Sequence, residues 1–210
     1  VPSGASISAG NGTPEVLIDF GSASGIVGVV ASNSCGSNST TYSVLVTPTP
    51  EFNISSSAVL CNGGSDGAVE LGALVGTAPF TYSLDGSSNS SGVFSGLTAG
   101  TYNASAVDAN GCSSALVSVT VNEPTVLTAS ASATDALCFG SCDGSATVSA
   151  GGGTPGYSYQ WNDPSAQTSA TASNLCAGSY SVVVTDANGC SQTVSVTINE
   201  PTVLTASAVG

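Results

Sequence analysis

Short runs of alternating apolar and polar residues recur along the chain, and each run ends at turn-forming Gly, Asn, Asp or Pro residues. Alternation with a period of two predicts β-strands with one buried face. The last third gives the clearest series, for which we expect six strands: TVLTASASA from Thr125, SATVSAG from Ser145, YSYQW from Tyr157, TASNL from Thr171, SYSVVVT from Ser179 and SQTVSVTI from Ser191. Because short β-branched runs favour strands and turns, no long helix is expected.

The strand pattern is repeated along the chain. NEPTVLTASA stands at 122–131 and again at 199–208, a shift of 77 residues, and the stretch that begins with DG at 66–67 aligns with DG at 143–144 at the same shift. Such self-similarity predicts two adjacent units, residues 51–124 and 125–201, with 202–210 opening a further repeat. We call the two units the first and the second repeat. Short Pro-bearing linkers, TPTPE at 47–51 and the NEP stretches, are stiff, so the modules are expected to follow one another as beads on a rod.

Residues 1–50 do not align with the repeat. Three runs in them alternate apolar and polar residues, at 16–20, 25–31 and 41–46. We interpret this segment as the C-terminal part of another immunoglobulin-like module whose first strands precede Val1. The lack of Met and the stop in mid-pattern at Gly210 suggest an interior piece of a longer chain.

A turn motif marks the end of each repeat. DANGCS occurs at 108–113 and at 186–191, and Asn-Gly tolerates the backbone of tight hairpin loops, so the motif is expected to close the last hairpin of each repeat. Tyr102 and Tyr180 stand at the start of the penultimate strand, as in the tyrosine corner of immunoglobulin-like sandwiches. The predicted fold is therefore all-β, with tandem immunoglobulin-like β-sandwich modules.

Charge narrows the functions that the chain can have. It contains 13 Asp and Glu residues and no Lys, Arg or His, which gives a net charge of −13. This charge repels nucleic acids and anionic lipid surfaces, and no run of 18 apolar residues predicts a membrane span. Without His or Lys there is no ordinary triad base and no Schiff-base amine, so we expect no enzyme. The acids mostly occupy turn positions, where side-chain capping accounts for them.

The seven cysteines, with no His to complete a zinc set, point to disulfide bonds and an oxidising compartment. Repeat alignment makes Cys61 equivalent to Cys138 and Cys112 equivalent to Cys190. The economical pairing is Cys61 with Cys112 and Cys138 with Cys190. Cys142 and Cys176 occur together in the second repeat alone and are expected to form an extra bond, and Cys35 is expected to bond to a residue upstream of Val1. A structural zinc that uses Cys138 and Cys142 is an alternative, although a second close pair is lacking.

Two kinds of ligand site are alternatives to plain turn and core roles. Asp186 and Asn188 are spaced as in the opening of a calcium loop, and Glu200 in the linker could supply a further oxygen, although the other acids of such a loop are missing. Tyr157, Tyr159 and Trp161 alternate along one strand and share one face. On an outer face they would form a platform for stacking on sugars, but the aligned residues of the first repeat are all apolar, which suits a buried face better.

The second repeat resembles a known module. The order of DGSATVSAGGGTPGYSYQW, LCAGSYSVVVTDANGC and SQTVSVTINEP is similar to the SprB repeat, a module found in many copies in very large gliding-motility adhesins of gliding Gram-negative bacteria. The resemblance covers 51–201, whereas residues 1–50 resemble the tail of a PKD-like module. It implies export by the type IX secretion system, exposure on the bacterial cell surface, and contact with the secretion and motility machinery. Turn and strand residues such as GTAPFTYSLDG and GGTPGYSYQWN differ between the copies.

We therefore expect a structural stalk segment of a giant extracellular adhesin filament, used in attachment and gliding motility. Its partners would be the neighbouring modules of the same chain and, at a distance, a surface polysaccharide or another adhesion ligand. One alternative is an array of glycan-binding modules that act through platforms of the Trp161 type. Another is a self-assembling extracellular fibre or sheath subunit, which polymerisation at rising concentration would reveal.

Overall fold

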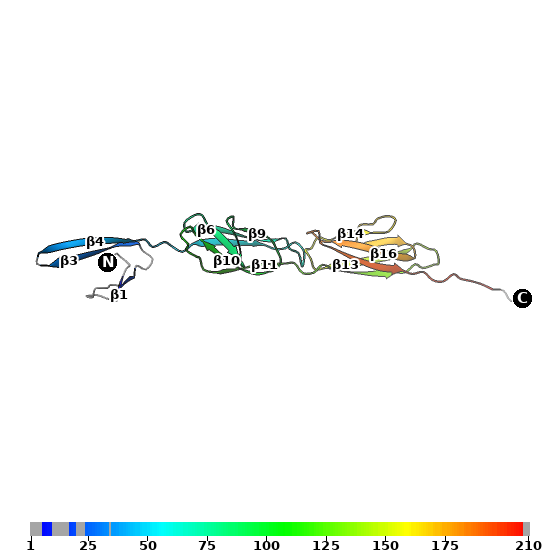
Figure 1. Cartoon of the computed structure of the whole chain (residues 1–210). Coiled ribbons are helices and arrows are strands. Elements are labelled where there is room, and N and C mark those ends of the chain that lie inside the picture. Colours follow the sequence, from blue (N-terminus) through cyan, green and yellow to red (C-terminus); the bar gives the residue numbers. More distant parts are fainter. Residues whose placement is uncertain (1–5, 10–16, 20–23, 34, 208–210) are drawn as a thin grey trace. The chain divides into compact units, whose positions relative to one another are not determined.

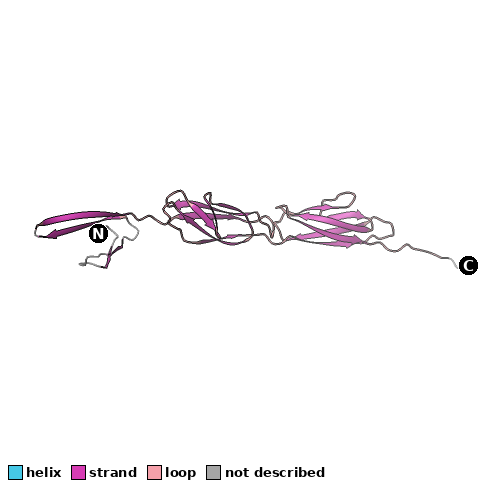
Figure 2. Ribbon diagram, in the orientation of Figure 1, coloured by secondary structure: helices cyan, strands magenta, loops and turns pink. Residues whose placement is uncertain are grey.

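The structure, a computed structural model, describes residues 6–9, 17–19, 24–33 and 35–207. Every regular element within these residues is a β-strand (Figures 1 and 2). The chain divides into two compact units, of which the first contains Val1–Ser55, Glu70–Val93 and Tyr102–Val119, and the second contains Ser56–Val69, Phe94–Thr101 and Thr120–Gly210. The division cuts through strands of the first repeat, whereas the second repeat lies wholly in the second unit.

The second repeat is a sandwich of two three-stranded antiparallel sheets. One sheet has the order β12-β13-β15 and the other the order β14-β16-β17. The strands are β12 (Thr128–Thr134), β13 (Gly144–Gly151), β14 (Ser158–Trp161), β15 (Thr171–Leu175), β16 (Gly178–Thr185) and β17 (Ser191–Ile198). All six expected strands are present, and the all-β immunoglobulin-like fold is confirmed.

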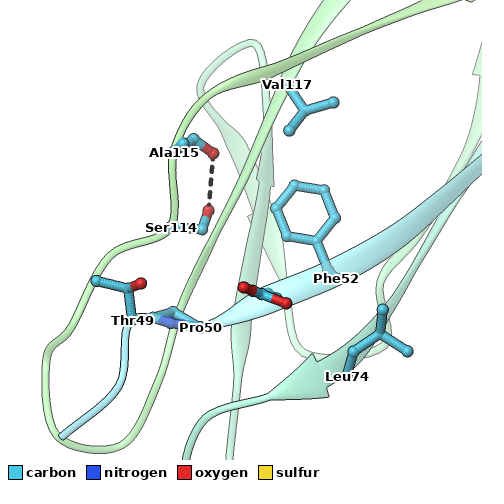
Figure 3. Close-up of a pocket in the computed structure, with 8 residues that line it drawn as sticks. Thr49, Pro50, Phe52, Leu74, Ser114, Ala115 and Val117 are labelled. Atoms are coloured by element: carbon cyan, nitrogen blue, oxygen red, sulfur yellow. Dashed lines mark hydrogen bonds between the residues drawn. The ribbon is translucent and has the colours of Figure 1, made fainter. Parts of the chain in front are cut away.

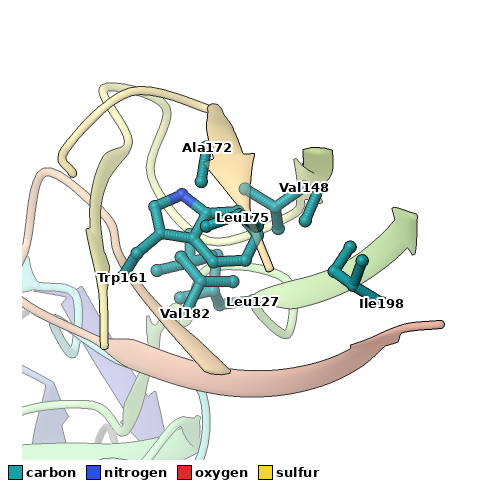
Figure 4. Packing of buried hydrophobic residues seen from close by; sticks show 9 residues of the cluster. Leu127, Val148, Trp161, Ala172, Leu175, Val182 and Ile198 are labelled. Carbon is teal, nitrogen blue, oxygen red and sulfur yellow. The ribbon is translucent and has the colours of Figure 1, made fainter. Parts of the chain in front are cut away.

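Alternating residues of the two sheets meet in one core. Trp161 from β14 lies among aliphatic side chains from both sheets and is 2% exposed (Figure 4). The other buried members of the core are Leu127, Ala146, Val148, Ala172, Leu175, Val182, Val184 and Ile198. Burying each large aliphatic side chain contributes about 1.5 to 3 kcal/mol, so this core is the main source of stability of a small module.

The tyrosine corner is present in the second repeat. Tyr180, near the start of β16, donates its hydroxyl to the carbonyl of Cys176 at 3.0 Å. A bond from the penultimate strand back to the backbone a few residues upstream is the feature that the name describes. It fixes the loop that leads from β15 into β16.

The two cysteine-bearing loops of a repeat lie at opposite ends of its last strand. In the second repeat, Ala136 donates its N–H to the carbonyl of Asn199 at 2.9 Å, which places the loop of Cys138 beside the end of β17. Cys190 directly precedes the start of that strand. Since a strand rises about 3.3 Å per residue, the eight residues of β17 separate the two ends by roughly 26 Å.

The first repeat has the same arrangement with one added strand. Its sheets have the orders β5-β6-β9 and β11-β10-β7-β8. The strands are β5 (Glu51–Ser57), β6 (Gly67–Val75), β7 (Thr81–Leu84), β8 (Ser87–Asn89), β9 (Val93–Leu97), β10 (Gly100–Val107) and β11 (Val117–Val121). The added strand β8 pairs with β7 through a two-residue turn at Asp85 and Gly86, whose φ angles are 44° and 87°. Such a positive-φ Asp-Gly pair matches the twist of a hairpin.

The N-terminal segment contains two antiparallel strand pairs. Strand β1 (Ser6–Ala9) pairs with β2 (Leu17–Asp19), and β3 (Gly25–Asn33) pairs with β4 (Gly36–Val44) in continuous register. The second and third expected runs correspond to β3 and β4, although β4 begins five residues earlier than the run at 41–46. Of the run at 16–20, β2 covers 17–19, and the remaining two residues lie outside the described residues.

Candidate functional site

The repeated turn motif is held together by its aspartate. In the second repeat, Asp186 Oδ1 accepts the backbone N–H groups of Asn188 and Cys190, both at 2.9 Å, and the turn ends with Gly189 at a φ of 85°. The turn joins β16 to β17 in unbroken register, with Thr185 opposite Ser191. The motif therefore closes the last hairpin, as the sequence predicts, but only its glycine, and not its asparagine, has a positive φ.

The second oxygen of the same carboxylate fastens the turn to another loop. Asp186 Oδ2 accepts the N–H of Thr154 at 2.8 Å, and the side chain is buried. The first repeat repeats this contact, with Asp108 Oδ2 on the N–H of Thr77 at 3.1 Å. The Thr154 donor foremost lowers the pKa of Asp186 below its usual value; burial opposes the shift, and the N–H groups of the turn add to it. The carboxylate thus stays charged and shapes this end of the module.

Asn188 extends the turn to the preceding repeat. Its side-chain amide donates to the carbonyl of Leu60 and to Thr154 Oγ1, each at 2.9 Å. Leu60 belongs to the loop after the first strand of the first repeat, and both residues lie in the second compact unit. In the first repeat the equivalent Asn110 makes the matching bond to Thr77 Oγ1 at 2.9 Å. One amide therefore orders its own turn and binds the neighbouring repeat.

A disulfide bond joins the repeats at this place. Cys61 is bonded to Cys190, with 5.7 Å between their Cα atoms, across a sequence separation of 129 residues. The expected pairs, Cys61 with Cys112 and Cys138 with Cys190, are therefore wrong. The physical reason is the length of the last strand, because Cys138 and Cys190 flank opposite ends of β17 and a disulfide requires Cα atoms about 4.4 to 6.8 Å apart. We call the contact of 60–63 with 186–190 the repeat junction.

The other cysteines have different surroundings. Cys142 is bonded to Cys176, the pair that their joint presence in one repeat suggested. Cys138 is an exposed thiol, and the half-buried thiol of Cys112 lies 3.2 Å from Thr47 Oγ1. Cys35 is exposed in the β3–β4 turn, and its bond to an upstream residue stays a prediction.

The residues considered for calcium are engaged with the backbone. Asp186 and Asn188 make the contacts given above, and Glu200 Oε2 accepts the N–H of Gly140 at 2.6 Å. Across the described part of the chain, no group of three or more His, Cys, Asp or Glu side chains could hold a metal ion. These oxygens hold loops in the structure, and calcium binding by them stays a prediction.

The three aromatic residues of β14 and its approach face the core. Trp161 is buried and donates its indole N–H to the carbonyl of Ser169 at 2.9 Å, and Tyr157 donates its hydroxyl to the carbonyl of Gly152 at 2.6 Å. Tyr157 and Tyr159 are partly buried against the same cluster. The arrangement is a core face, and it leaves no open indole surface for stacking on a sugar.

A shallow cavity of about 330 Å³ lies in the first unit (Figure 3). Its wall combines the apolar side chains of Phe52, Leu74 and Val117 with the Glu51 carboxylate. Ser114 and Ala115 complete one side, in the stretch between Cys112 and Asn122 where the first repeat has one residue more than the second. The cavity therefore accompanies a local insertion.

Asp163 is a buried carboxylate that no sequence motif marks as a site. Asp163, after β14, accepts the N–H groups of Ser165 and Gln167 and the side-chain amide of Gln167, at 2.9 to 3.1 Å. Burial raises its pKa, but these donors outweigh burial and hold the pKa below its usual value. Its only sequence signal is an Asp-Pro pair, which is typical of turns.

We expect acid to weaken the second repeat through Asp186. Its pKa is lowered on folding from about 3.9, so the charged carboxylate contributes stability that is fully present above that value and is lost as the pH falls through the folded pKa. Asp186→Asn should lower the melting temperature at neutral pH. The difference from the unmodified chain should shrink as the pH is lowered below about 4, as thermal melts followed by circular dichroism would show.

The difference between variants matters because acid also relieves repulsion among the other carboxylates. Glu70→Gln, on an exposed position of β6, is the matched control and should leave the melting temperature unchanged across the range. A melting difference for Asp186→Asn that stays constant from neutral to strongly acid pH would contradict the assigned role of the charge.

Family models match three parts of the chain. A model described as the SprB repeat matches residues 53–89 and again 130–166, and a model described as a PKD-like domain matches residues 1–46. The two SprB matches fall one in each repeat. No curated protein matches the chain. Within the described residues, no helix is long and apolar enough to cross a membrane.

Solved structures with similar folds include chains of several immunoglobulin-like domains. Three immunoglobulin domains of titin, in a mutated variant, match with 16% identity over 85% of this chain and 75% of that chain, at a TM-score of 0.42. The IgVJ-C2 molecule of amphioxus matches with 15% identity over 66% and 98%, at 0.32. A C-terminal fragment of intimin, solved with the intimin-binding domain of its translocated receptor, matches with 18% identity over 72% and 63%, at 0.38.

Proposed function

We propose that this chain, which carries two SprB repeats preceded by a PKD-like domain, is a structural stalk segment of an extracellular cell-surface adhesin. The observation that supports this most is the covalent bond between Cys61 of one repeat and Cys190 of the next. Disulfide bonds persist in oxidising surroundings outside the cytosol, which fits a surface location. Adhesin-type repeats of this kind suggest a structural protein rather than an enzyme.

A bond between repeats suits a segment that transmits tension. Adjacent modules of one chain are ordinarily connected by their linker alone, here the NEP stretch at 122–124. The bond of Cys61 to Cys190 adds a second covalent connection, through which a pull on the first repeat reaches the last hairpin of the second repeat directly. A stalk that holds a distal binding region away from a cell has use for such a connection.

The finer parts of the proposal derive from the SprB repeat itself. They are export by the type IX secretion system, a place in surface filaments used in gliding motility, and contact with the motility machinery. A polysaccharide or another adhesion ligand would be bound elsewhere than at Trp161, since the ring of that residue is buried in the second repeat. The neighbouring modules are the partners that the repeat junction supports.

The test is to locate the segment on intact cells of its source. An antibody against residues 125–201 is detected by immunogold electron microscopy, with permeabilised cells as the control for hidden antigen. We expect gold on filaments that extend from the surface of unpermeabilised cells. Gold on a regular sheath, in the medium only, or only after permeabilisation would overturn the proposal.

A further inference from the structure

The second repeat carries a copy of the loop that bonds to its neighbour in the first repeat. Around Cys61, Leu60 donates its N–H to Asp66 Oδ1 at 3.1 Å, and Gly63 donates its N–H to Glu123 Oε2 at 2.7 Å. These contacts hold the loop against the linker that follows the repeat. The loop is thus shaped by its own repeat before any neighbour is involved.

Each contact recurs 77 residues later around Cys138. The N–H of Leu137 bonds to Asp143 Oδ1 at 3.1 Å, and the N–H of Gly140 bonds to Glu200 Oε2 at 2.6 Å. Two backbone hydrogen bonds recur as well. The bond from the N–H of Val59 to the carbonyl of Asn122 corresponds to that from Ala136 to Asn199. The bond from the N–H of Gly64 to the carbonyl of Cys61 corresponds to that from Ser141 to Cys138. The loop of Cys138 therefore has the conformation of the loop that forms the bond between repeats.

The surface around Cys138 is exposed and apolar. The side chains of Leu137 and Phe139 are 79% and 59% exposed, and they flank the exposed thiol. At the occupied junction, the residue equivalent to Leu137 is Leu60, whose carbonyl accepts the amide of Asn188. Leu60 remains 53% exposed in the bonded junction, and Asn62 stands where the second repeat has Phe139, so the features that the two loops share are the backbone contacts and the cysteine.

The two ends of each repeat carry different cysteines. Its cysteine loop lies at the end of the last strand, and its hairpin cysteine lies at the start of that strand, so the two ends of one module are different and complementary. Within the second unit, the loop end of the first repeat meets the hairpin end of the second repeat. Residues 202–208 have the same sequence, TVLTASA, as residues 125–131, where the second repeat begins.

From this equivalence we propose that Cys138 bonds to the hairpin cysteine of an SprB-type repeat that begins at Thr202, and that successive repeats of an array are joined in this way, each loop to the next hairpin. The two thiols lose two protons and two electrons, and a disulfide oxidant such as oxidised glutathione is reduced to two thiols in the exchange. The carbonyl of Leu137 accepts the asparagine amide of the incoming hairpin. The inference concerns covalent architecture and does not depend on the adhesin role.

The test uses the full chain with one repeat added. Residues 134–201, with serine in place of the added copy of Cys138, are appended after Gly210, which continues the register of 202–210, and the protein is refolded with reduced and oxidised glutathione. Remaining thiols are alkylated, and the protein is digested with a protease that cleaves before Asp, because trypsin finds no Lys or Arg. Mass spectrometry then identifies the cross-linked peptides. We expect Cys138 linked to the added copy of Cys190, with complete loss of its alkylation.

Two comparisons make the outcome decisive. Cys138→Ser in the extended chain should leave the added hairpin cysteine fully alkylated while the bond of Cys61 to Cys190 remains. The original chain, mapped in the same way, should show Cys61 bonded to Cys190 and Cys138 alkylated, and this measurement does not require the extension to fold. A link of Cys138 to Cys112 or to its own repeat's Cys190, or full alkylation of Cys138 in the extended chain, would overturn the proposal.

Discussion

Replacing Cys190 by serine is expected to lower the free energy of unfolding of the segment that the bond encloses, residues 61–190 of the two repeats, by about 4 to 5 kcal/mol. The bond closes a sequence separation of 129 residues, and in the chain-entropy model the loss of so long a closed loop has this magnitude. The variant also frees Cys61 in the first repeat. Urea unfolding under non-reducing conditions, followed by circular dichroism, measures the change.

Cys112→Ser is the matched control, since it changes the equivalent hairpin cysteine of the first repeat, whose thiol is not in a disulfide in the structure. Serine retains a polar group beside Thr47 Oγ1, so a change well below 1 kcal/mol is expected. Cys61→Ser should reproduce the effect of Cys190→Ser. If Cys112→Ser were as destabilising as Cys190→Ser, the bond would lie within the first repeat and the repeat junction would be wrongly assigned.

Replacing Trp161 by alanine is expected to destabilise the second repeat by about 3 to 5 kcal/mol. The indole fills the centre of the core between the two sheets, and its removal leaves a cavity and an acceptor, the carbonyl of Ser169, without its donor (Figure 4). Because Trp161 is the only tryptophan, calorimetry rather than fluorescence should follow the variant.

The control for the core is Val183→Ala on β16. Val183 is 37% exposed and lies between two residues that are fully buried, so its truncation should cost less than about 1 kcal/mol. Unmodified protein should show a tryptophan emission that does not shift when polysaccharide is added. A stable Trp161→Ala variant, or an emission shift with polysaccharide, would instead favour an exposed stacking surface.

Local sequence signals were sufficient for the strands of the second repeat. Alternation located β13 and β16, because one face of each strand is buried against the opposite sheet. Tyr180 was placed correctly since its bond spans only four residues. The hairpin of β7 and β8 is not predicted by alternation, because the polar residues of β8 lack the pattern of a buried strand, and only the turn residues Asp85 and Gly86 signal it.

The repeat junction could not be found by alignment alone. Alignment establishes that Cys61 is equivalent to Cys138, and this holds equally for a bond within a repeat and a bond between repeats. Which of the two bonds can form depends on the end of the last strand that each cysteine loop adjoins. The hydrogen bond of Ala136 to Asn199 places the Cys138 loop at the end of β17, far from Cys190. The contact of Asp186 Oδ2 with the N–H of Thr154 also cannot be predicted from the turn motif, because it joins two loops that are 32 residues apart in the sequence.

The bond of Cys61 to Cys190 also determines what a protease can achieve. A single cut of the backbone anywhere between these two residues opens a covalent ring without releasing either fragment. The two fragments remain joined by the disulfide. The distal part of the chain is therefore released only by a cut outside the ring, or by a cut inside it together with reduction of the disulfide. Where each repeat is bonded to the next, the rings overlap, and isolated cuts along such an array leave it in one covalent piece.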